Sequence, residues 1–206
     1  MLAIRFANEC DTTAIRRVMD KALDTVKPGD FIADDIAFIK RHVNGAQGFG
    51  MVVTDSTVVV AYLLVRFPGD ATDNLGRDIA LPDESLSHVV HMESVAVTPA
   101  WQGKGIQRCL VYYGESAAID LGARWSLCTV APNNSHSLAN FTALGYRVVK
   151  HAVKYSGHGR LIMVKSLTSE DHSLIHKDNF IISNSNLAVP DLATFNDLGK
   201  LRRRVR

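Results

Sequence analysis

Two short stretches of the sequence carry residue types that could do chemistry. Gly103, Lys104 and Gly105 follow a β-branched apolar run that ends in Thr-Pro, and a helical pattern begins directly after them. Glycines at a strand-to-helix turn let main-chain N–H groups approach an anion, and the first turn of the helix adds a positive dipole. Upstream, His91 and Glu93 alternate in a strand pattern, so both project from one face and either is a candidate general base.

Other interpretations compete for the glycine turn. A P-loop requires Gly-Lys followed by Ser or Thr, but here Gly105 and Ile106 follow the lysine. A dinucleotide fingerprint requires a third glycine where this chain has Arg108, and it expects its strand near the start of a βαβ series. A plain surface turn that uses glycine for positive φ is the structural alternative. A nucleotide-phosphate enzyme that binds ATP or NAD is therefore disfavoured by the spacing.

The pattern V-A-V-x-P-x-x-Q-G-K-G-I, residues 95–106, resembles the acetyl-coenzyme A motif of the GNAT superfamily of N-acetyltransferases. The resemblance implies acetyl-CoA as the cofactor, with its diphosphate on this turn and with Lys104 and Arg108 adding positive charge. Gln107 departs from the small residue usual at its position, and it either narrows the loop or reaches a phosphate with its amide. The implied cofactor-binding residues of the turn are Gln102, Gly103, Lys104, Gly105, Ile106, Gln107 and Arg108.

The resemblance also implies a path for the pantetheine arm. In this family the strand before the loop hydrogen-bonds that arm through its backbone, here at Val95, Ala96 and Val97, while the following strand splays away near residues 128–130. The segment N-N-S-H-S-L-A-N-F-T-A-L-G-Y, residues 133–146, is similar to the family's second cofactor segment. Its implied contacts are Asn134, which also suits the N-cap of a helix, together with Ser137 and Phe141.

Phe141 stands where many family members have a tyrosine that protonates the leaving thiolate. Phenylalanine has no proton to donate, so water, Ser137 or Cys128 would serve, or the thiolate would leave unaided. The tyrosines elsewhere, Tyr155 among them, are assigned to packing or loops. The implied function is transfer of an acetyl group to a primary amine by direct attack in a ternary complex, with Glu93 or His91 as catalytic base. The alternative is a non-catalytic module that binds acyl-CoA.

Hydrophobic periodicity places these motifs on a mixed, mostly antiparallel α/β sheet of six to seven strands with helices on both faces. The expected order is β-α-α-β-β-β-α-β-α-β-β, with a helix from about Asp11 and a second helix from about Phe31 that has Ile32, Ile36, Ile39 and Val43 at helical spacing. Residues 67–87 are polar and acidic, and they form either a loop that attracts a cationic amine or solvated filler. The acceptor is a small-molecule or peptide amine whose identity is not encoded in these motifs.

Composition excludes several classes of protein. Of the 206 residues, 47% are hydrophobic and 21% charged, and the net charge of +2 gives no basic field for nucleic acid or membrane. The longest apolar run, residues 58–65, is too short to span a bilayer, and the start of the chain lacks a signal-peptide pattern. Three scattered cysteines argue against a disulfide scaffold or a metal site and fit a reducing cytoplasm.

The chain is expected to divide into two parts. Residues 1–167 form the GNAT-like domain, and residues 168–206 form a more polar C-terminal extension that ends in a short helix. The extension could act as a lid, a dimer clasp or a tail, so a homodimer is one expected arrangement.

Overall fold

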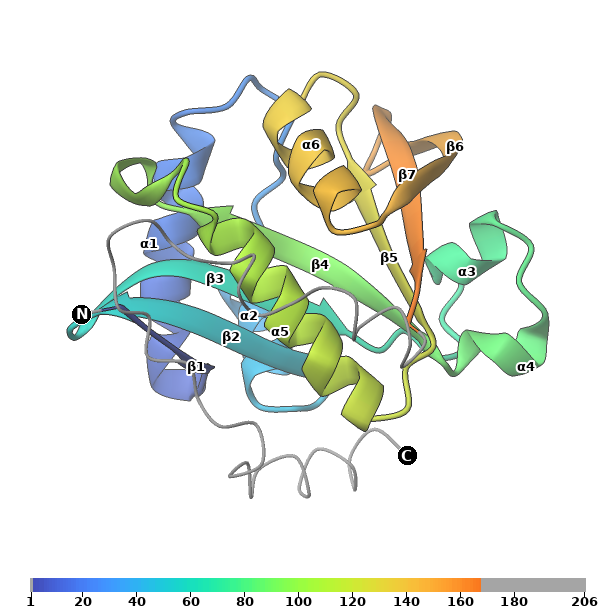
Figure 1. Cartoon of the computed structure of the whole chain (residues 1–206), viewed down its shortest axis with the longest axis horizontal. Coiled ribbons are helices and arrows are strands. Elements are labelled where there is room, and N and C mark those ends of the chain that lie inside the picture. The colour runs from blue at the N-terminus through green and yellow to red at the C-terminus, as the bar shows by residue number, and fades with distance from the viewer. Residues whose placement is uncertain (1, 168–206) are drawn as a thin grey trace.

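The central strands are apolar throughout because helices cover both faces of the sheet. The computed structural model describes residues 2–167, which form a seven-stranded sheet in the order β1-β2-β3-β4-β5-β7-β6 (Figure 1). All neighbours are antiparallel except the β4–β5 pair, which is parallel. This confirms the predicted mixed sheet. The strands are β1 (Leu2–Phe6), β2 (Gly48–Asp55), β3 (Val58–Arg66), β4 (Val89–Val97), β5 (Trp125–Val130), β6 (Arg147–Lys154) and β7 (His158–Ser166).

Two layers of helix enclose the sheet. Helix α5 (Ile106–Asp120) packs over β2, β3 and β4 on one face, and α1 (Thr12–Leu23) and α2 (Ile36–Val43) pack on the other (Figure 1). Alternate residues of β3 serve the two cores: Leu63 and Val65 lie in the α5 core, whereas Tyr62 and Leu64 lie in the α1–α2 core. Helix α6 (Ser135–Ala143) follows β5 and contacts α5. Two 3-10 turns, Glu9–Asp11 and Pro99–Trp101, precede α1 and α5.

The sheet opens between its two parallel strands. Strands β4 and β5 pair only at Val89 with Trp125, Val90 with Ser126 and His91 with Leu127. Beyond this point β4 continues to Val97 beside β3, and β5 continues beside β7, without further pairing to each other. The predicted splay near residues 128–130 is therefore confirmed, and it leaves the β5-facing edge of β4 open.

The second helix begins later than predicted. It starts at Ile36, because the Asp35 carboxylate accepts a hydrogen bond from the Phe38 N–H and caps the helix there. The expected start near Phe31 was wrong, and Ile32 precedes the helix. Of the residues at helical spacing, Ile39 is fully buried, whereas Ile32 and Ile36 are 38% and 41% exposed.

Residues 67–87 fold into more structure than a loop. They contain two short helices, α3 (Leu75–Asp78) and α4 (Asp83–Leu86), at the end of the sheet where β4 begins (Figure 1). The predicted C-terminal extension and its terminal helix lie outside the described residues.

Candidate functional site

The glycine turn adopts the backbone that its sequence predicts. Gly103 and Gly105 have φ values of 74° and 78°, a region that favours glycine, and a side chain at Gly103 would meet open space. Upstream, the Gln102 side-chain amide donates to the Val97 carbonyl at 3.1 Å. This bond ties the turn back onto the end of β4 and fixes where α5 begins.

The turn exposes a row of unused donors. Within residues 2–167, the main-chain N–H groups of residues 103–108 donate to no protein acceptor, and the Cys109 N–H is the first to bond, at 3.0 Å to Gly105 O. These donors lie at the N-terminus of the 15-residue helix α5, whose dipole favours negative charge. The arrangement suits an anion with several oxygens.

The Arg108 side chain lies beside the same row of donors. Its Nε atom is buried and has no partner among the described residues. Its guanidinium folds back toward the turn, with Nη2 3.8 Å from where a Cβ on Gly105 would lie. Lys104 Nζ lies 5.5 Å from the centre of the Trp101 ring. An unsatisfied guanidinium beside free N–H groups fits the diphosphate of a coenzyme A molecule. We call residues 102–108 the anion turn.

Removal of the Arg108 charge gives a direct test of the anion turn. We expect Arg108→Met to weaken coenzyme A binding by about 10- to 100-fold, because a hydrogen bond to a charged group contributes about 1.5–3 kcal/mol. Isothermal titration with coenzyme A measures the dissociation constant. Arg17→Met, an exposed arginine on α1, serves as the matched control. Equal affinities for the two variants would remove Arg108 from the site.

Gln107 holds two helices together. Its side-chain nitrogen donates to Ser137 Oγ at 3.3 Å, and its oxygen accepts from the Asn140 amide at 2.7 Å. Asn134 caps α6 by accepting from the Ser137 N–H at 3.0 Å, as predicted. In this structure the Gln107 amide is therefore used to join α5 to α6, and Asn140 is a partner that the sequence patterns missed. Cofactor contacts of Asn134 and Ser137 stay predictions.

The open edge of β4 links the anion turn to the middle of the sheet. Val95, Ala96 and Val97 pair with β3 on one side, and no strand pairs with them on the side that faces β5. The side chains of Ala96 and Val97 are buried in the cores. Only their backbone is offered to this opening, which suits the hydrogen bonding of an extended arm. We call this opening the β4–β5 slot.

Phe141, which replaces the family's tyrosine, and Cys128, a candidate proton donor to the leaving thiolate, both lie in the core. Phe141 is 3% exposed, and its ring packs edge-on against Tyr146 at 4.9 Å. Cys128 is 2% exposed, and burial raises the pKa of its thiol well above the usual value. Cys128 thus remains a protonated, enclosed thiol. The Phe141 ring packs against Tyr146, and its cofactor contact stays a prediction.

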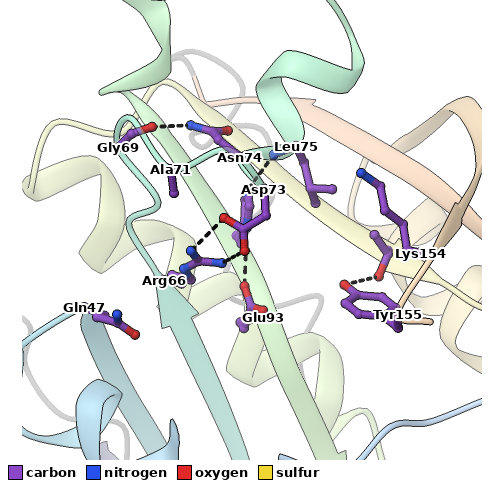
Figure 2. A network of polar contacts seen from close by, with 12 residues as sticks. Gln47, Arg66, Gly69, Ala71, Asp73, Asn74, Leu75, Glu93, Lys154 and Tyr155 are labelled. Carbon is purple, nitrogen blue, oxygen red and sulfur yellow. Dashed lines mark hydrogen bonds and ion pairs between the residues drawn. The ribbon is translucent and has the colours of Figure 1, made fainter.

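Tyr155 lies beside the part of β5 that has separated from β4, a position that the sequence did not predict. Its hydroxyl is 3.0 Å from Thr129 Oγ1, on the part of β5 that has separated from β4. In Figure 2 the hydroxyl end of Tyr155 points toward Glu93. Tyr155 lies in the turn between β6 and β7, so its loop assignment is confirmed, and the residue is 46% exposed. Partial desolvation of its hydroxyl raises the pKa of the phenol, so Tyr155 keeps its proton at neutral pH.

A β-bulge interrupts β4 at one of the two candidate bases. Leu64 pairs with Ser94 and Val65 pairs with Met92, so Glu93 is the extra residue of β4. His91 Nδ1 lies 3.3 Å from Glu93 Oε2, which confirms that the two side chains share a face. His91 is 3% exposed, and its other ring nitrogen accepts the Leu75 N–H at 3.1 Å. Of the two candidates, Glu93 has the freer side chain.

Neighbouring groups keep Glu93 ionised. Burial opposes its charge, but the His91 hydrogen bond and the positive charge of Arg66 outweigh burial and hold the pKa of Glu93 below its ordinary value. Arg66 is itself held by two hydrogen bonds to Asp73, at 2.8 and 2.9 Å, beside Glu93 (Figure 2). A carboxylate of lowered pKa is suited to orient an amine or a water molecule.

A second carboxylate interacts with Glu93. Asp34, in the loop before α2, bonds the Ser94 hydroxyl, which in turn lies 2.8 Å from the buried Tyr62 hydroxyl. Burial and the charge of Glu93 raise the pKa of Asp34 to about 6. Sequence reasoning missed Asp34 because about 60 residues separate it from β4, and only the packing of α1 and α2 against the sheet brings it to this face.

Three of the five carboxylates in the acidic segment 67–87 form ion pairs, two of them with residues outside the segment. Asp73 pairs with Arg66, Asp83 with Arg77 at 3.2 Å, and Asp78 with Lys154 at 2.6 Å. These pairs weaken the attraction of the segment for a cationic amine. The segment also contacts a candidate base directly, because the Leu75 N–H donates to His91.

Comparisons with known proteins agree with this geometry. A family model described as the acetyltransferase (GNAT) family matches residues 15–146. Among solved structures, yncA of Salmonella typhimurium, determined with acetyl-CoA, is 23% identical and has a TM-score of 0.61, covering 82% of this chain and 95% of that one. NAA60 of Arabidopsis thaliana with acetyl-CoA is 14% identical, with a TM-score of 0.66 and coverage of 81% and 98%.

A third solved structure has the same fold. The ribosomal-protein-S18-alanine N-acetyltransferase of Escherichia coli is 15% identical, with a TM-score of 0.59 and coverage of 82% and 95%. No curated protein sequence matches the chain. Residues 2–167 contain no helix long and apolar enough to cross a membrane, and no group of three or more metal-ligating side chains occurs in that range.

Proposed function

The chain belongs to the GNAT acetyltransferase family, and we propose that it transfers the acetyl group of acetyl-CoA to a primary amine by direct attack in a ternary complex. One observation carries the proposal: the β4–β5 slot connects the free N–H groups of residues 103–108 to the carboxylate of Glu93 along a single strand. Phosphate binding, arm binding and base catalysis would then occur on consecutive parts of β4 and its turn.

The residues of this chain divide the work of the reaction. When bound, acetyl-CoA supplies an acetyl thioester that exchanges its carbon–sulphur bond for a carbon–nitrogen bond. The anion turn and the open edge of β4 hold the two reactants in line, which lowers the entropic cost of their meeting. Glu93 takes the proton of the amine, directly or through one water molecule, because an alkylammonium has no lone pair for attack. Tyr155, whose hydroxyl lies 3.0 Å from Thr129 Oγ1 on the separated part of β5, would return a proton to the leaving sulphur.

Asp34 gives the proposed acceptor site a pH dependence. We expect kcat/KM for the amine to fall as pH drops below about 6, because protonation removes the charge that would pair with an ammonium group. Asp34→Asn is expected to remove this acidic limb and to raise KM for the amine about tenfold. A pH series of initial rates measures both effects, and Asp30→Asn on the same loop is the control.

Protein stability provides a check on Asp34 that does not depend on activity. The folded-state pKa is raised above 3.8, so the native protein holds this proton more tightly than the unfolded chain does. The resulting stabilisation is full below about pH 4 and is lost as pH rises through about 6. Chemical denaturation should show this loss in the wild type and not in Asp34→Asn. Identical pH dependence in both proteins would contradict the burial of Asp34.

The experiment that tests the proposed function is a screen of small-molecule and peptide amines with acetyl-CoA, followed by detection of free thiol. Acetylation of at least one amine supports the enzyme. Saturable coenzyme A binding without transfer to any amine would favour the alternative, a non-catalytic acyl-CoA module, which the phenylalanine at position 141 and Gln107 favour.

We further propose a cytoplasmic location and no nucleic-acid partner. Cys10, Cys109 and Cys128 are all free thiols, which suits a reducing compartment. The homodimer stays a prediction, and light scattering of the full chain tests it.

A further inference from the structure

The two ring nitrogens of His91 face groups of opposite hydrogen-bonding character. The Leu75 main-chain N–H can only donate, so Nε2, 3.1 Å away, must be an acceptor without a proton. The proton of the neutral ring is then on Nδ1, which lies 3.3 Å from the Glu93 carboxylate. A single backbone donor thus determines which nitrogen of a buried imidazole addresses Glu93.

The position of the Leu75 N–H is itself strongly constrained. Asn74, fully buried, donates to the carbonyls of Gly69 at 2.8 Å and Leu86 at 3.2 Å, and its side-chain oxygen accepts the Gly76 N–H at 2.8 Å. Asn74 therefore caps the first turn of α3, and Leu75 is the first residue of that helix.

The same segment is fastened to the sheet a second time. Asp73 makes two hydrogen bonds to Arg66, the residue of β3 that pairs with His91 (Figure 2). Residues 69–76, which we call the strap, thus contact both His91 and Arg66, two groups that lower the pKa of Glu93. The strap is therefore held by the Arg66–Asp73 hydrogen bonds in addition to those of the Asn74 side chain.

We propose that the strap is a positioning element for the reaction: the Leu75 main-chain N–H fixes the Nδ1–H tautomer of His91, which in turn orients the Glu93 carboxylate. This inference rests on the proposed function of Glu93. In the opposite tautomer, the Nδ1 lone pair would face a carboxylate oxygen, and the hydrogen bond to Glu93 would be lost. A carboxylate without this donor is free to rotate away from the amine.

Proline at position 75 tests the strap because its ring carbon replaces the N–H that donates to His91 Nε2, so the hydrogen bond is lost and the imidazole must move away from the strap. The first helical position tolerates proline, and Asn74 already has φ −60° and ψ 117°, the extended form that precedes proline. Leu75→Ala is the matched control, because both variants lose the buried leucine side chain but only proline loses the N–H. We expect kcat of Leu75→Pro to be roughly fivefold to tenfold below that of Leu75→Ala, with KM for acetyl-CoA unchanged.

Nitrogen-15 spectra of the full chain report the tautomer without any activity assay. The His91 signals are identified by their loss in His91→Gln. We expect the Nδ1–H form in the wild type and in Leu75→Ala, and a mixture of both forms in Leu75→Pro. If Leu75→Pro does not fold, Asn74→Ser, which keeps the cap but loses both amide donors, should show the same mixture.

Two outcomes would overturn the inference. One is the Nε2–H form of His91 in the wild type, and the other is identical spectra and rates for the proline and alanine variants. An enzyme that transfers no acetyl group but shows the expected spectra would instead contradict the proposed function and leave the role of the strap in fixing the tautomer intact.

Discussion

Replacing Glu93 by glutamine is expected to lower kcat about 10²- to 10⁴-fold, the usual contribution of a general base. Glutamine keeps the size of the side chain and its oxygen, so the hydrogen bond from His91 Nδ1 can persist. Only the negative charge is lost. In the wild type His91 and Arg66 stabilise this charge by lowering the pKa of Glu93 below the ordinary carboxyl value. The dissociation constant of coenzyme A should be unchanged, because Glu93 lies away from the anion turn.

The measurement for Glu93→Gln combines turnover with binding. Initial rates of thiol release give kcat, and isothermal titration gives the affinity for coenzyme A. Glu84→Gln, at an exposed position on α4, is the matched control and should behave as the wild type. A Glu93→Gln protein with wild-type kcat across the pH range would show that the amine loses its proton elsewhere.

Replacing Gly105 by valine should abolish coenzyme A binding, with a loss of at least about 100-fold in affinity. Gly105 has φ 78°, which a β-branched residue adopts only under strain, so the backbone must shift within the row of free N–H groups. The displaced N–H groups would lose their present directions, and several charge-assisted hydrogen bonds to the diphosphate would be lost together.

Gly122→Val separates this loss from simple destabilisation. Gly122 follows the other end of α5, has φ 97° and has open space around a would-be Cβ, whereas a Cβ on Gly105 would lie in ordinary contact with Arg108, at 3.8 Å. Both variants should lose comparable unfolding free energy in chemical denaturation, about 1–2 kcal/mol, because both place a side chain in the left-handed region. Only Gly105→Val should lose coenzyme A binding in titration. Equal affinities in the two variants would mean that the anion turn does not hold the phosphates.

The parts of the fold that depend on local patterns were predictable from the sequence. The apolar run of β3 predicts a strand buried on both faces, and the glycine turn predicts positive φ values before a helix. Alternation predicts that His91 and Glu93 share a face. The bulge changes the register only from Glu93 onward, so the two side chains stay on one face. Each of these inferences needs only residues close together in the chain.

The parts that depend on tertiary packing were not predictable. Nothing in the sequence around Asp34 connects it to Glu93, because their interaction arises from the packing of α1 and α2 on the sheet. The Leu75 contact is a backbone N–H, which has no side-chain signature. The apolar periodicity predicts a helix from about Phe31, but the Asp35 cap sets its first residue at Ile36.

The most direct test of the central claim is a titration of the isotope-labelled protein with coenzyme A, followed by the amide signals of residues 103–108. Hydrogen bonding to phosphate oxygens should shift these signals downfield, with saturation in the wild type and no response in Gly105→Val. Pantetheine, which lacks the diphosphate, should leave them nearly unmoved. Amides 103–108 that stay in place while coenzyme A saturates the protein would contradict the assignment of the anion turn.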